Sequence, residues 1–203
     1  MLDKNLFAST LSRLSDFKQD VSGDEWLKQA VEIVAEQLSL IFAGIYLTDT
    51  TKTWAIFRAG SGKTGKVLLE HKHKLEIDKN ILSAVGQSIL TNTIWVTEQI
   101  PPRGQNQTEL KPDVYDKVYD EANVGLHFVS TKPVRYCSPL IPARWYLVFP
   151  LRKAKQPIGA LIAYTDQRND FTADDFICLQ RLADQLMEII GLDLTGIASS
   201  DGG

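Results

Sequence analysis

The C-terminal part of the chain holds the pattern that constrains the fold most. Two runs rich in β-favouring residues, 145–152 and 157–166, flank a polar four-residue turn (153–156), which predicts a β-hairpin. A helix is predicted to follow over residues 173–192, with Thr172 as its N-cap and acidic residues in its first turn. The apolar face of this helix consists of Phe176, Leu179, Leu182, Ala183, Leu186, Ile189 and Ile190. A hairpin that runs into a long amphipathic helix predicts an α+β domain in which helices pack on a mainly antiparallel sheet.

The N-terminal half carries the same two kinds of pattern. Residues 2–17 predict a short amphipathic helix, and residues 25–41 predict a longer one. One apolar stripe of the longer helix consists of Leu27, Ala30, Val31, Val34, Leu38 and Ile41. A second stripe on a neighbouring face consists of Trp26, Ile33 and Leu40, so the helix is expected to pack against two partners. Strands are predicted at 43–49 and 53–60 around a polar turn, residues 66–77 read as extended, residues 81–90 as a helix and residues 94–96 as a short strand.

Composition excludes several broad classes of function. The 203 residues carry a formal net charge of −3, and the basic residues are spread out, so neither nucleic acid nor a membrane is expected as a partner. No apolar run approaches the roughly 20 residues that cross a bilayer, and the N-terminus does not look like a secretory signal. Two cysteines, Cys137 and Cys178, are too few for a disulfide framework or a four-ligand zinc site. A cytoplasmic protein is therefore expected.

Residues 98–144 break the regular pattern. Prolines at 101, 102, 133, 139 and 142 and the polar run 103–109 predict loops, with one helix expected over residues 112–122. A connection of this length is usually functional, for instance a lid or a partner surface. The alternative is a mobile insertion, and the residues do not decide between the two.

The segment Gly60-Ser61-Gly62-Lys63-Thr64-Gly65-Lys66 superficially resembles a phosphate-binding loop. Such a loop needs a Ser or Thr directly after its lysine to hold magnesium, and Val67 occupies that position. The residues that follow also read as extended rather than as the helix whose N-terminus meets the phosphates. A glycine-rich bend between two strands is the favoured interpretation.

The residues do not assemble a catalytic or metal-binding set. His71 and His73 would share one face of a strand, but the lysines around them favour a solvated surface strand over a metal site. Cys137 lies in a predicted loop near Arg135, which could lower the pKa of its thiol, yet no histidine adjoins it. A nucleophile, a base and an orienting group are therefore not found together, and the protein is expected not to be an enzyme.

Aromatic residues give the stronger functional signal. Several lie at strand or loop positions with arginines nearby, an arrangement typical of a small-molecule pocket, although ordinary core packing is the alternative for each. The candidate pocket consists of Tyr46, Trp54, Arg58, Trp95, Tyr136, Cys137, Arg144 and Trp145. The sequence identifies no cofactor.

Taken in order, these segments resemble the GAF domain family over roughly residues 25–192. In that family a strand ending in Pro-Leu precedes a tight turn, a strand with Ile-Gly-Ala-Leu and a helix opened by Phe-(Ser/Thr)-x-x-Asp. The matching residues are Pro150, Leu151, Ile158, Gly159, Ala160, Leu161, Phe171, Asp175, Leu182, Ala183, Gln185 and Leu186. The resemblance implies a GAF-like (profilin/PAS-like) α+β fold, a central antiparallel sheet with helices 25–41 and 173–192 on one face and loops over the other.

The resemblance also implies a division of the chain and a role. Residues 1–23 would form a helical extension, 24–193 the GAF-like domain with its insertion at 98–144, and 194–203 a disordered tail. Relatives of this kind are sensory modules in bacterial signalling that bind small molecules or dimerise and act through a partner protein. A homodimer is expected, with Trp26, Ile33 and Leu40 as its candidate interface. The alternative is a pure interaction module whose pocket is collapsed.

Specialised members of the family fit less well. Phe176 replaces the glutamate of the cyclic-nucleotide pattern, and Ser138 follows Cys137 where bilin-binding relatives have a histidine. The methionine sulfoxide reductases of this family need several cysteines in one pocket, which two distant ones do not supply.

Overall fold

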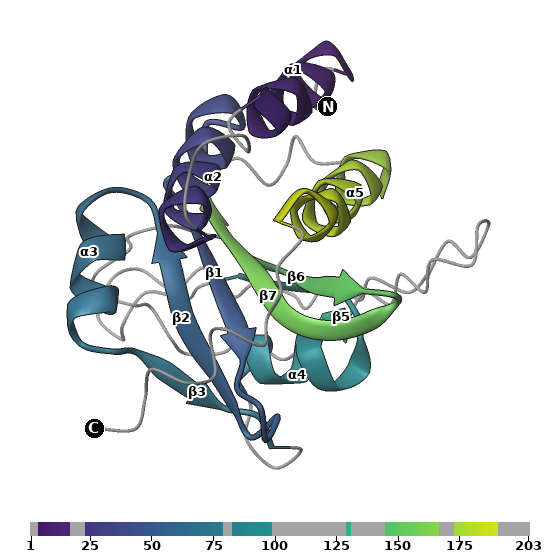
Figure 1. Cartoon of the computed structure of the whole chain (residues 1–203). Helices are drawn as coiled ribbons and strands as arrows, with labels where there is room; N and C mark the ends of the chain where they lie inside the picture. Colours follow the sequence, from purple (N-terminus) through teal and green to yellow (C-terminus); the bar gives the residue numbers. More distant parts are fainter. Residues whose placement is uncertain are drawn as a thin grey trace, which may run out of the picture.

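A seven-stranded sheet forms the centre of this computed structural model, which describes residues 4–16, 23–78, 83–98, 129–130, 145–166 and 173–190. The strands lie in the order β3-β2-β1-β7-β6-β4-β5, and all neighbours are antiparallel except β4 and β5 (Figure 1). The strands are β1 (Phe42–Thr48), β2 (Trp54–Gly60), β3 (Lys74–Glu76), β4 (Trp95–Glu98), β5 (Val129–Ser130), β6 (Trp145–Lys153) and β7 (Gln156–Thr165). The helices are α1 (Lys4–Asp16), α2 (Gly23–Gln37), α3 (Gly62–Glu70), α4 (Ala84–Thr91) and α5 (Ala173–Ile190). The predicted α+β fold with a mainly antiparallel sheet is confirmed.

Two tight hairpins build the middle of the sheet. The β6–β7 turn places Ala154 and Lys155 at φ angles of 49° and 67°, the left-handed pair that matches the twist of a two-residue hairpin. In the β1–β2 turn, Asp49 Oδ1 accepts hydrogen bonds from the backbone N–H groups of Thr53 (2.8 Å) and Trp54 (3.0 Å). Burial opposes ionisation of this carboxyl, but the bonds from the Thr51 hydroxyl and the backbone prevail and lower the pKa of Asp49. Both predicted hairpins are confirmed.

Helices α2 and α5 cover one face of the sheet, and α1 packs on these two helices (Figure 1). Their apolar faces meet the inward residues of the strands in one core, in which Leu27, Phe149 and Leu182 are fully buried. Helix α1 belongs to this core, because Leu14 has no exposed surface and Phe7 and Leu11 pack beside it. We call this side of the sheet the three-helix face.

Helix α2 ends earlier than the sequence predicted. It stops at Gln37, and Ser39 takes a φ of 50°, a left-handed conformation that helices commonly use to end. As a result Ile41, predicted to lie on the buried stripe, is 44% exposed, whereas Leu38 is 6% exposed.

The opposite face of the sheet is covered in part by α4, and α3 packs beside β2 (Figure 1). This corrects two predictions. The described part of this face carries a helix as well as connecting segments, and residues 66–77 are not extended throughout, since α3 occupies Gly62–Glu70 before the short strand β3. A second apolar cluster lies here, with Phe57, Val85 and Val148 among its members. We call this side the α4 face.

The predicted insertion lies almost entirely outside the described residues. Within it, the structure describes Glu98, the last residue of β4, and β5, a parallel neighbour of β4 at the edge of the sheet. The predicted helix over residues 112–122, the tail 194–203 and the N-cap Thr172 also lie outside the described part of the chain.

Candidate functional site

Aromatic rings gather on the α4 face because side chains alternate across a strand. Positions 42 and 46 of β1, 57 of β2, 146 of β6 and 164 of β7 all point to this side, as their shared apolar cluster shows. The imidazole of His73, just before β3, completes a continuous series. We call this series the aromatic row; from one end to the other it consists of His73, Tyr46, Phe57, Phe42, Tyr164 and Tyr146.

Ring-to-ring contacts join the row along its length. The ring centres of Tyr46 and Phe57 are 5.0 Å apart, and those of Phe57 and Phe42 are 6.5 Å apart. Phe42 meets Tyr164 edge to face at 5.9 Å, and Tyr164 stacks on Tyr146 at 4.5 Å. These separations are those of favourable aromatic pairs, so the row is a continuous series of packed rings.

One end of the row is a polar pair. The Tyr46 hydroxyl and His73 Nδ1 lie 3.0 Å apart, while Tyr46 is 3% exposed and His73 is half-buried. The backbone fixes the imidazole, because the His73 N–H donates to the Leu68 carbonyl (3.0 Å) and the His73 carbonyl accepts from the Phe57 N–H (2.9 Å). Burial lowers the pKa of His73 and, with a smaller effect from Tyr164, raises the pKa of Tyr46 well above its ordinary value. Both groups are therefore neutral near pH 7, and a hydrogen bond joins the phenol oxygen to Nδ1, its donor set by the tautomer of the imidazole.

The other end is a pair of stacked phenols. Tyr146 is partly buried and Tyr164 is 9% exposed. Burial, and then the neighbouring phenols of Tyr164 and Tyr46, raise the pKa of Tyr146 well above its ordinary value. The row thus has hydroxyl or imidazole groups at both ends and the phenyl rings of Phe57 and Phe42 between them.

Glycine makes room for the rings in the middle of the row. A Cβ atom on Gly44, between Phe42 and Tyr46 on β1, would lie 3.0 Å from the rings of both Phe42 and Phe57. Side chains larger than hydrogen would push these rings out of line.

The candidate pocket predicted from the sequence divides between the two faces. Tyr46 and Trp95 belong to the α4-face cluster. Ala55 and Phe57 pack in the α4-face cluster. Trp54 and Arg58 alternate with them along β2 and therefore point to the three-helix side. Tyr136, Cys137 and Arg144 lie outside the described residues.

The residues on the three-helix side have partners of their own. Arg58 donates to Asp24 at the start of α2 (2.8 Å), and the Lys74 ammonium lies 4.3 Å from the centre of a Trp54 ring. Trp145 is 5% exposed and shares its strand side with Leu147 and Phe149 of the helical core. Among the described members of the predicted set, Tyr46 and Trp95 therefore lie on the α4 face, and Trp54, Arg58 and Trp145 lie on the other side of the sheet.

Trp95 of β4 directs its indole N–H toward the end of α4. Its indole N–H donates to the Thr93 hydroxyl at 3.1 Å, and Thr93 lies 2.6 Å from the Thr91 hydroxyl. The indole is 7% exposed, so it forms a wall of the α4 face rather than an open contact.

Sequence reasoning missed most of the aromatic row. His73 was interpreted as a surface histidine, and Phe42, Phe57 and Tyr164 were not included in the pocket. Reading each predicted strand at a period of two, outward from Tyr46, would have found the phenylalanines and Tyr164. No short-range signal marks His73, because its partner lies 27 residues away.

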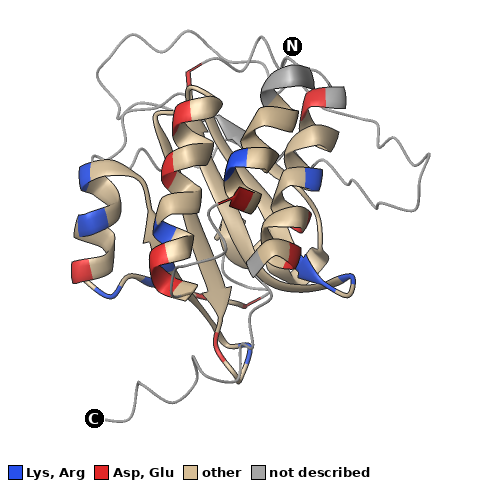
Figure 2. Ribbon diagram, turned by 45° about the horizontal axis from the view of Figure 1, so that its top comes forward, with Lys and Arg blue, Asp and Glu red and all other residues tan. Residues whose placement is uncertain are grey.

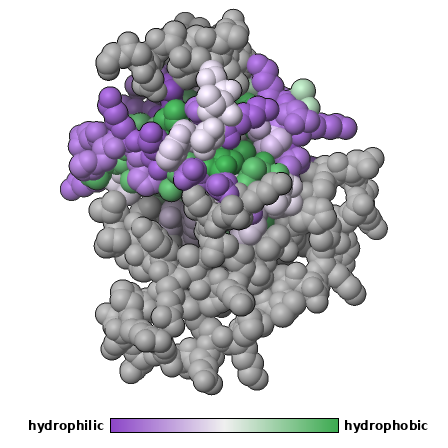
Figure 3. Space-filling model, turned by 90° about the horizontal axis from the view of Figure 1, so that it is seen from below, coloured by the Kyte–Doolittle hydropathy of each residue, from purple (hydrophilic) through white to green (hydrophobic). Residues whose placement is uncertain are grey.

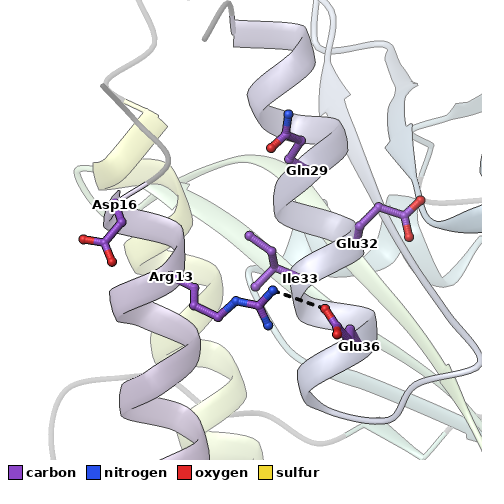
Figure 4. A pocket seen from close by; sticks show the side chains of 6 residues that line it. All are labelled: Arg13, Asp16, Gln29, Glu32, Ile33 and Glu36. Atoms are coloured by element: carbon purple, nitrogen blue, oxygen red, sulfur yellow. Dashed lines mark hydrogen bonds and ion pairs between the residues drawn. The ribbon is translucent and has the colours of Figure 1, made fainter. Parts of the chain in front are cut away.

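The candidate interface residues are largely covered within the chain. Trp26 is 4% exposed and Ile33 is 7% exposed, and Leu40 is partly buried against the same core. A groove of about 400 Å³ runs between α1 and α2 above Ile33, lined by Arg13, Asp16, Gln29, Glu32 and Glu36 (Figure 4). Arg13 crosses it to Glu36 at 3.3 Å (Figure 4). The predicted interface stays a prediction.

The glycine-rich segment begins α3 rather than bending between two strands, which corrects the sequence interpretation. Gly65 must be glycine, because an added Cβ would lie 1.9 Å from the Gly60 carbonyl oxygen where the helix touches β2. The first backbone N–H of the helix already has an acceptor, since the Gly62 N–H donates to the Glu32 carboxylate at 2.8 Å. A carboxylate of the chain itself thus lies where a phosphate would be bound.

The described residues contain no cluster of three or more His, Cys, Asp or Glu side chains that could hold a metal ion. Among the described helices, none is both long enough and apolar enough to cross a membrane.

Comparison with known proteins found no match to a family model and no match among curated proteins. Solved structures with a similar fold include an enzyme. Free methionine-R-sulfoxide reductase from Neisseria meningitidis, in complex with its substrate, superposes with a TM-score of 0.57 at 14% identity over 94% of this chain and 93% of that one. Reductases of the same kind from Thermoplasma acidophilum and Staphylococcus aureus also match. The expectation that the protein is not an enzyme is therefore corrected, because this fold carries catalysis in other proteins.

GAF domains of known structure match over almost the whole chain. The GAF domain of Acinetobacter phosphoenolpyruvate-protein phosphotransferase has a TM-score of 0.61 at 18% identity, covering 97% of this chain and 98% of that one. The corresponding domain from Coxiella burnetii has a TM-score of 0.65 at 13% identity, covering 94% of this chain and 95% of that one. With the hairpins, helices and sheet order described above, these superpositions show that the chain has the GAF fold.

Proposed function

We propose that the protein is a sensory or regulatory GAF module that binds a small molecule at the aromatic row and signals through a partner protein. The observation that carries this proposal is the Tyr46–His73 pair at the end of the row. Two neutral polar groups, held by backbone contacts from α3 and β2, lie at the end of an otherwise mostly apolar cluster, and His73 is its partly exposed member there. A few fixed polar groups on aromatic walls are the usual make-up of a small-molecule site.

Viewed from below, the described surface carries hydrophobic residues in its middle and hydrophilic residues around them, which suits a small-molecule site on this side of the protein (Figure 3). The names of the structural neighbours point the same way: one is a putative GAF sensor protein from Burkholderia vietnamiensis, and another is a reductase seen with its substrate.

Strand β1 offers a route from the site to the helices. Tyr46 of this strand belongs to the row, while its neighbours Ile45 and Leu47 are buried in the core of the three-helix face. A ligand that shifts Tyr46 would therefore act on the packing of α1, α2 and α5 and change the relative populations of their arrangements.

Native mass spectrometry of freshly purified protein tests the proposal, because it reports bound mass and oligomeric state together. We expect a bound small molecule, or a metabolite that raises the Tm by binding the folded state. Tyr46→Phe, which keeps the ring and removes the hydroxyl, should weaken that binding, whereas Trp54→Phe on the other side of the sheet should not.

Two results would overturn the proposal. One is a concentration-dependent dimer with no bound mass and no Tm increase from any compound of a metabolite library, which would favour a pure interaction module. The other is binding that is lost equally in Tyr46→Phe and Trp54→Phe.

A further inference from the structure

The groove between α1 and α2 lies on the three-helix face, away from the aromatic row, and has a volume of about 400 Å³. Ile33 lies between the two helices, with Asp16 and Gln29 toward one end of the groove and Glu36 toward the other (Figure 4). Ile33 is 7% exposed and belongs to the helical core below. The groove therefore has an apolar floor and polar ends.

The fold holds both walls of the groove in place. Leu14 of α1 has no exposed surface, and Phe7 and Leu11 pack on the same core. Helix α1 contacts α5 as well as α2, so its position beside α2 is supported from two sides. The groove is thus a fixed surface feature of the packed helices.

Carboxylates outnumber basic groups around the groove. Its lining includes the carboxylates of Asp16, Glu32 and Glu36 and one basic group, Arg13. Among the described residues, Asp16 has no ion pair or hydrogen-bond partner. Glu36 pairs with Arg13 at 3.3 Å, but both side chains are about half exposed or more, so the pair is weak and can exchange its cation. Asp16 and Glu36 are therefore available to a cation that enters the groove.

Helix α2 extends this negative character beyond the groove. It contains one basic residue, Lys28, whose ammonium is paired with Glu25 at 3.7 Å. Its acidic residues, which mark the length of the helix in Figure 2, are Asp24, Glu25, Glu32 and Glu36. Arg58 of β2 pairs with Asp24, at the far end of α2 from Glu36. With a net charge of −3 on the whole chain, this helix attracts a basic partner and repels an acidic one.

The spacing of the polar ends matches one face of an α-helix. Gln29 and Glu36 are seven positions apart on α2, which is about 10 Å along the helix axis. A second helix that lies along the groove presents its residues i, i+4 and i+7 over the same length. A basic side chain at each end of this set meets Asp16 and Glu36, and an apolar side chain between them meets Ile33.

We propose that the groove between α1 and α2 binds a basic amphipathic helix of the partner protein, with an apolar side chain on Ile33 and a lysine or arginine toward each of Asp16 and Glu36. Helices that dock in grooves use anchors at this spacing, and the charges select which helix is accepted. This inference rests on the part of the proposed function that calls for a partner protein, and it does not depend on a ligand at the aromatic row.

Three matched peptides test the proposal on the full chain. Each has about 15 residues in an alanine–glutamine host with blocked ends, a length at which such helices form in part. The first carries lysine, leucine and lysine at positions i, i+4 and i+7. Glutamine replaces both lysines in the second, and alanine replaces the leucine in the third. Binding is followed by the isoleucine δ1-methyl signals in two-dimensional NMR, where Ile33 reports on the groove and Ile162 in the α4-face cluster is the internal control.

We expect the lysine–leucine–lysine peptide to shift the Ile33 signal and to leave the Ile162 signal in place. It should bind about fivefold or more tightly than either other peptide, the effect of one exposed ion pair or one apolar contact. Asp16→Asn should weaken this binding about threefold or more. Glu70→Gln removes the same charge from the exposed end of α3 and is the matched control, with no change expected.

Three kinds of result would overturn the proposal. If a control peptide binds as tightly as the first, or if Glu70→Gln weakens binding as much as Asp16→Asn, the peptide is held by general attraction and not by the groove. If no peptide shifts Ile33, the groove does not bind a basic helix, while ligand binding that Tyr46→Phe weakens would leave the proposed small-molecule site standing. If the Ile33 signal shifts with protein concentration alone, a second copy of the chain covers the groove.

Discussion

The Glu32 carboxylate on α2 accepts a hydrogen bond from the backbone N–H of Gly62, the first residue of α3, at 2.8 Å. Helix α3 begins with an open N-terminus, since its N-cap Ser61 makes no side-chain capping bond. The Ser61 hydroxyl accepts instead from the Ala43 N–H at 3.0 Å. A distant carboxylate therefore supplies both the missing acceptor and the negative charge that a helix N-terminus favours.

Glu32→Ala should consequently loosen α3. We expect the free energy of unfolding to fall by about 1 kcal/mol, the usual contribution of a side chain that caps a helix N-terminus. Amide exchange at the start of α3 should also become faster. Glu36→Ala is the matched control on the same helix; its partner is the exposed Arg13, and such surface pairs contribute less than about 1 kcal/mol. Equal losses in the two variants would contradict a capping role for Glu32.

Two glycines at the start of α3 should respond differently to alanine. Gly65→Ala places a Cβ against the Gly60 backbone, which cannot move aside, so a loss of about 2 kcal/mol or more is expected from overpacking. Gly62→Ala meets no atom within 4 Å, and its cost of about 1 kcal/mol comes only from the φ of +61°. Urea unfolding of both variants measures the difference. A smaller loss for Gly65→Ala than for Gly62→Ala would show that α3 does not rest on β2 as described.

Local pattern was enough to predict the hairpins and the long helices. The β6–β7 unit and α5 have strong periods of two and 3.6, and their buried residues follow these periods closely. Helix α3 was missed because its nine residues include two glycines and no uniform apolar stripe. What stabilises it lies elsewhere in the chain, in Glu32 and in the close contact with Gly60, and no window of local sequence contains these contacts.

The candidate site was predicted only in part for a similar reason. Aromatic residues were grouped with arginines that were near them in sequence, but neighbours on a strand point to opposite faces. Arg58 therefore follows Phe57 in sequence while lying on the other side of the sheet. The Tyr46–His73 contact depends on how β3 pairs with β2, which the sequence alone does not determine.

The ion pair between Arg152 on β6 and Asp184 on α5 should stabilise the packing of α5 on the three-helix face. Arg152 Nε donates a hydrogen bond to Asp184 Oδ1 at 2.7 Å, and Gln180 Nε2 donates to the same oxygen at 3.0 Å. The Arg152 side chain is only 12% exposed, so Arg152→Met should lower the free energy of unfolding by about 1–3 kcal/mol, because Asp184 loses its charged partner and keeps only the hydrogen bond from Gln180 among those described. Arg13→Met removes the exposed pair with Glu36 and is the control, with an expected loss below about 1 kcal/mol. Chemical denaturation that shows no difference between the two variants would contradict this prediction.

His73 should make the stability of the protein depend on pH in the mildly acidic range. Burial lowers the pKa of His73 in the folded chain below the ordinary 6.5, so the unfolded chain binds a proton more readily. The stabilising effect of the neutral imidazole is therefore complete above pH 6.5 and is lost as the pH falls from 6.5 through the folded-state pKa.

The measurement is the free energy of unfolding as a function of pH for the native chain and for His73→Gln. We expect the variant to be less stable at neutral pH, because the contact with Tyr46 is lost, and to have a flatter profile as the pH falls below 6.5. His71→Gln, on the exposed end of α3, is the control for removing an imidazole from the surface. If His73→Gln keeps the full slope of the native chain below pH 6.5, then the imidazole of His73 is not the group whose protonation destabilises the fold.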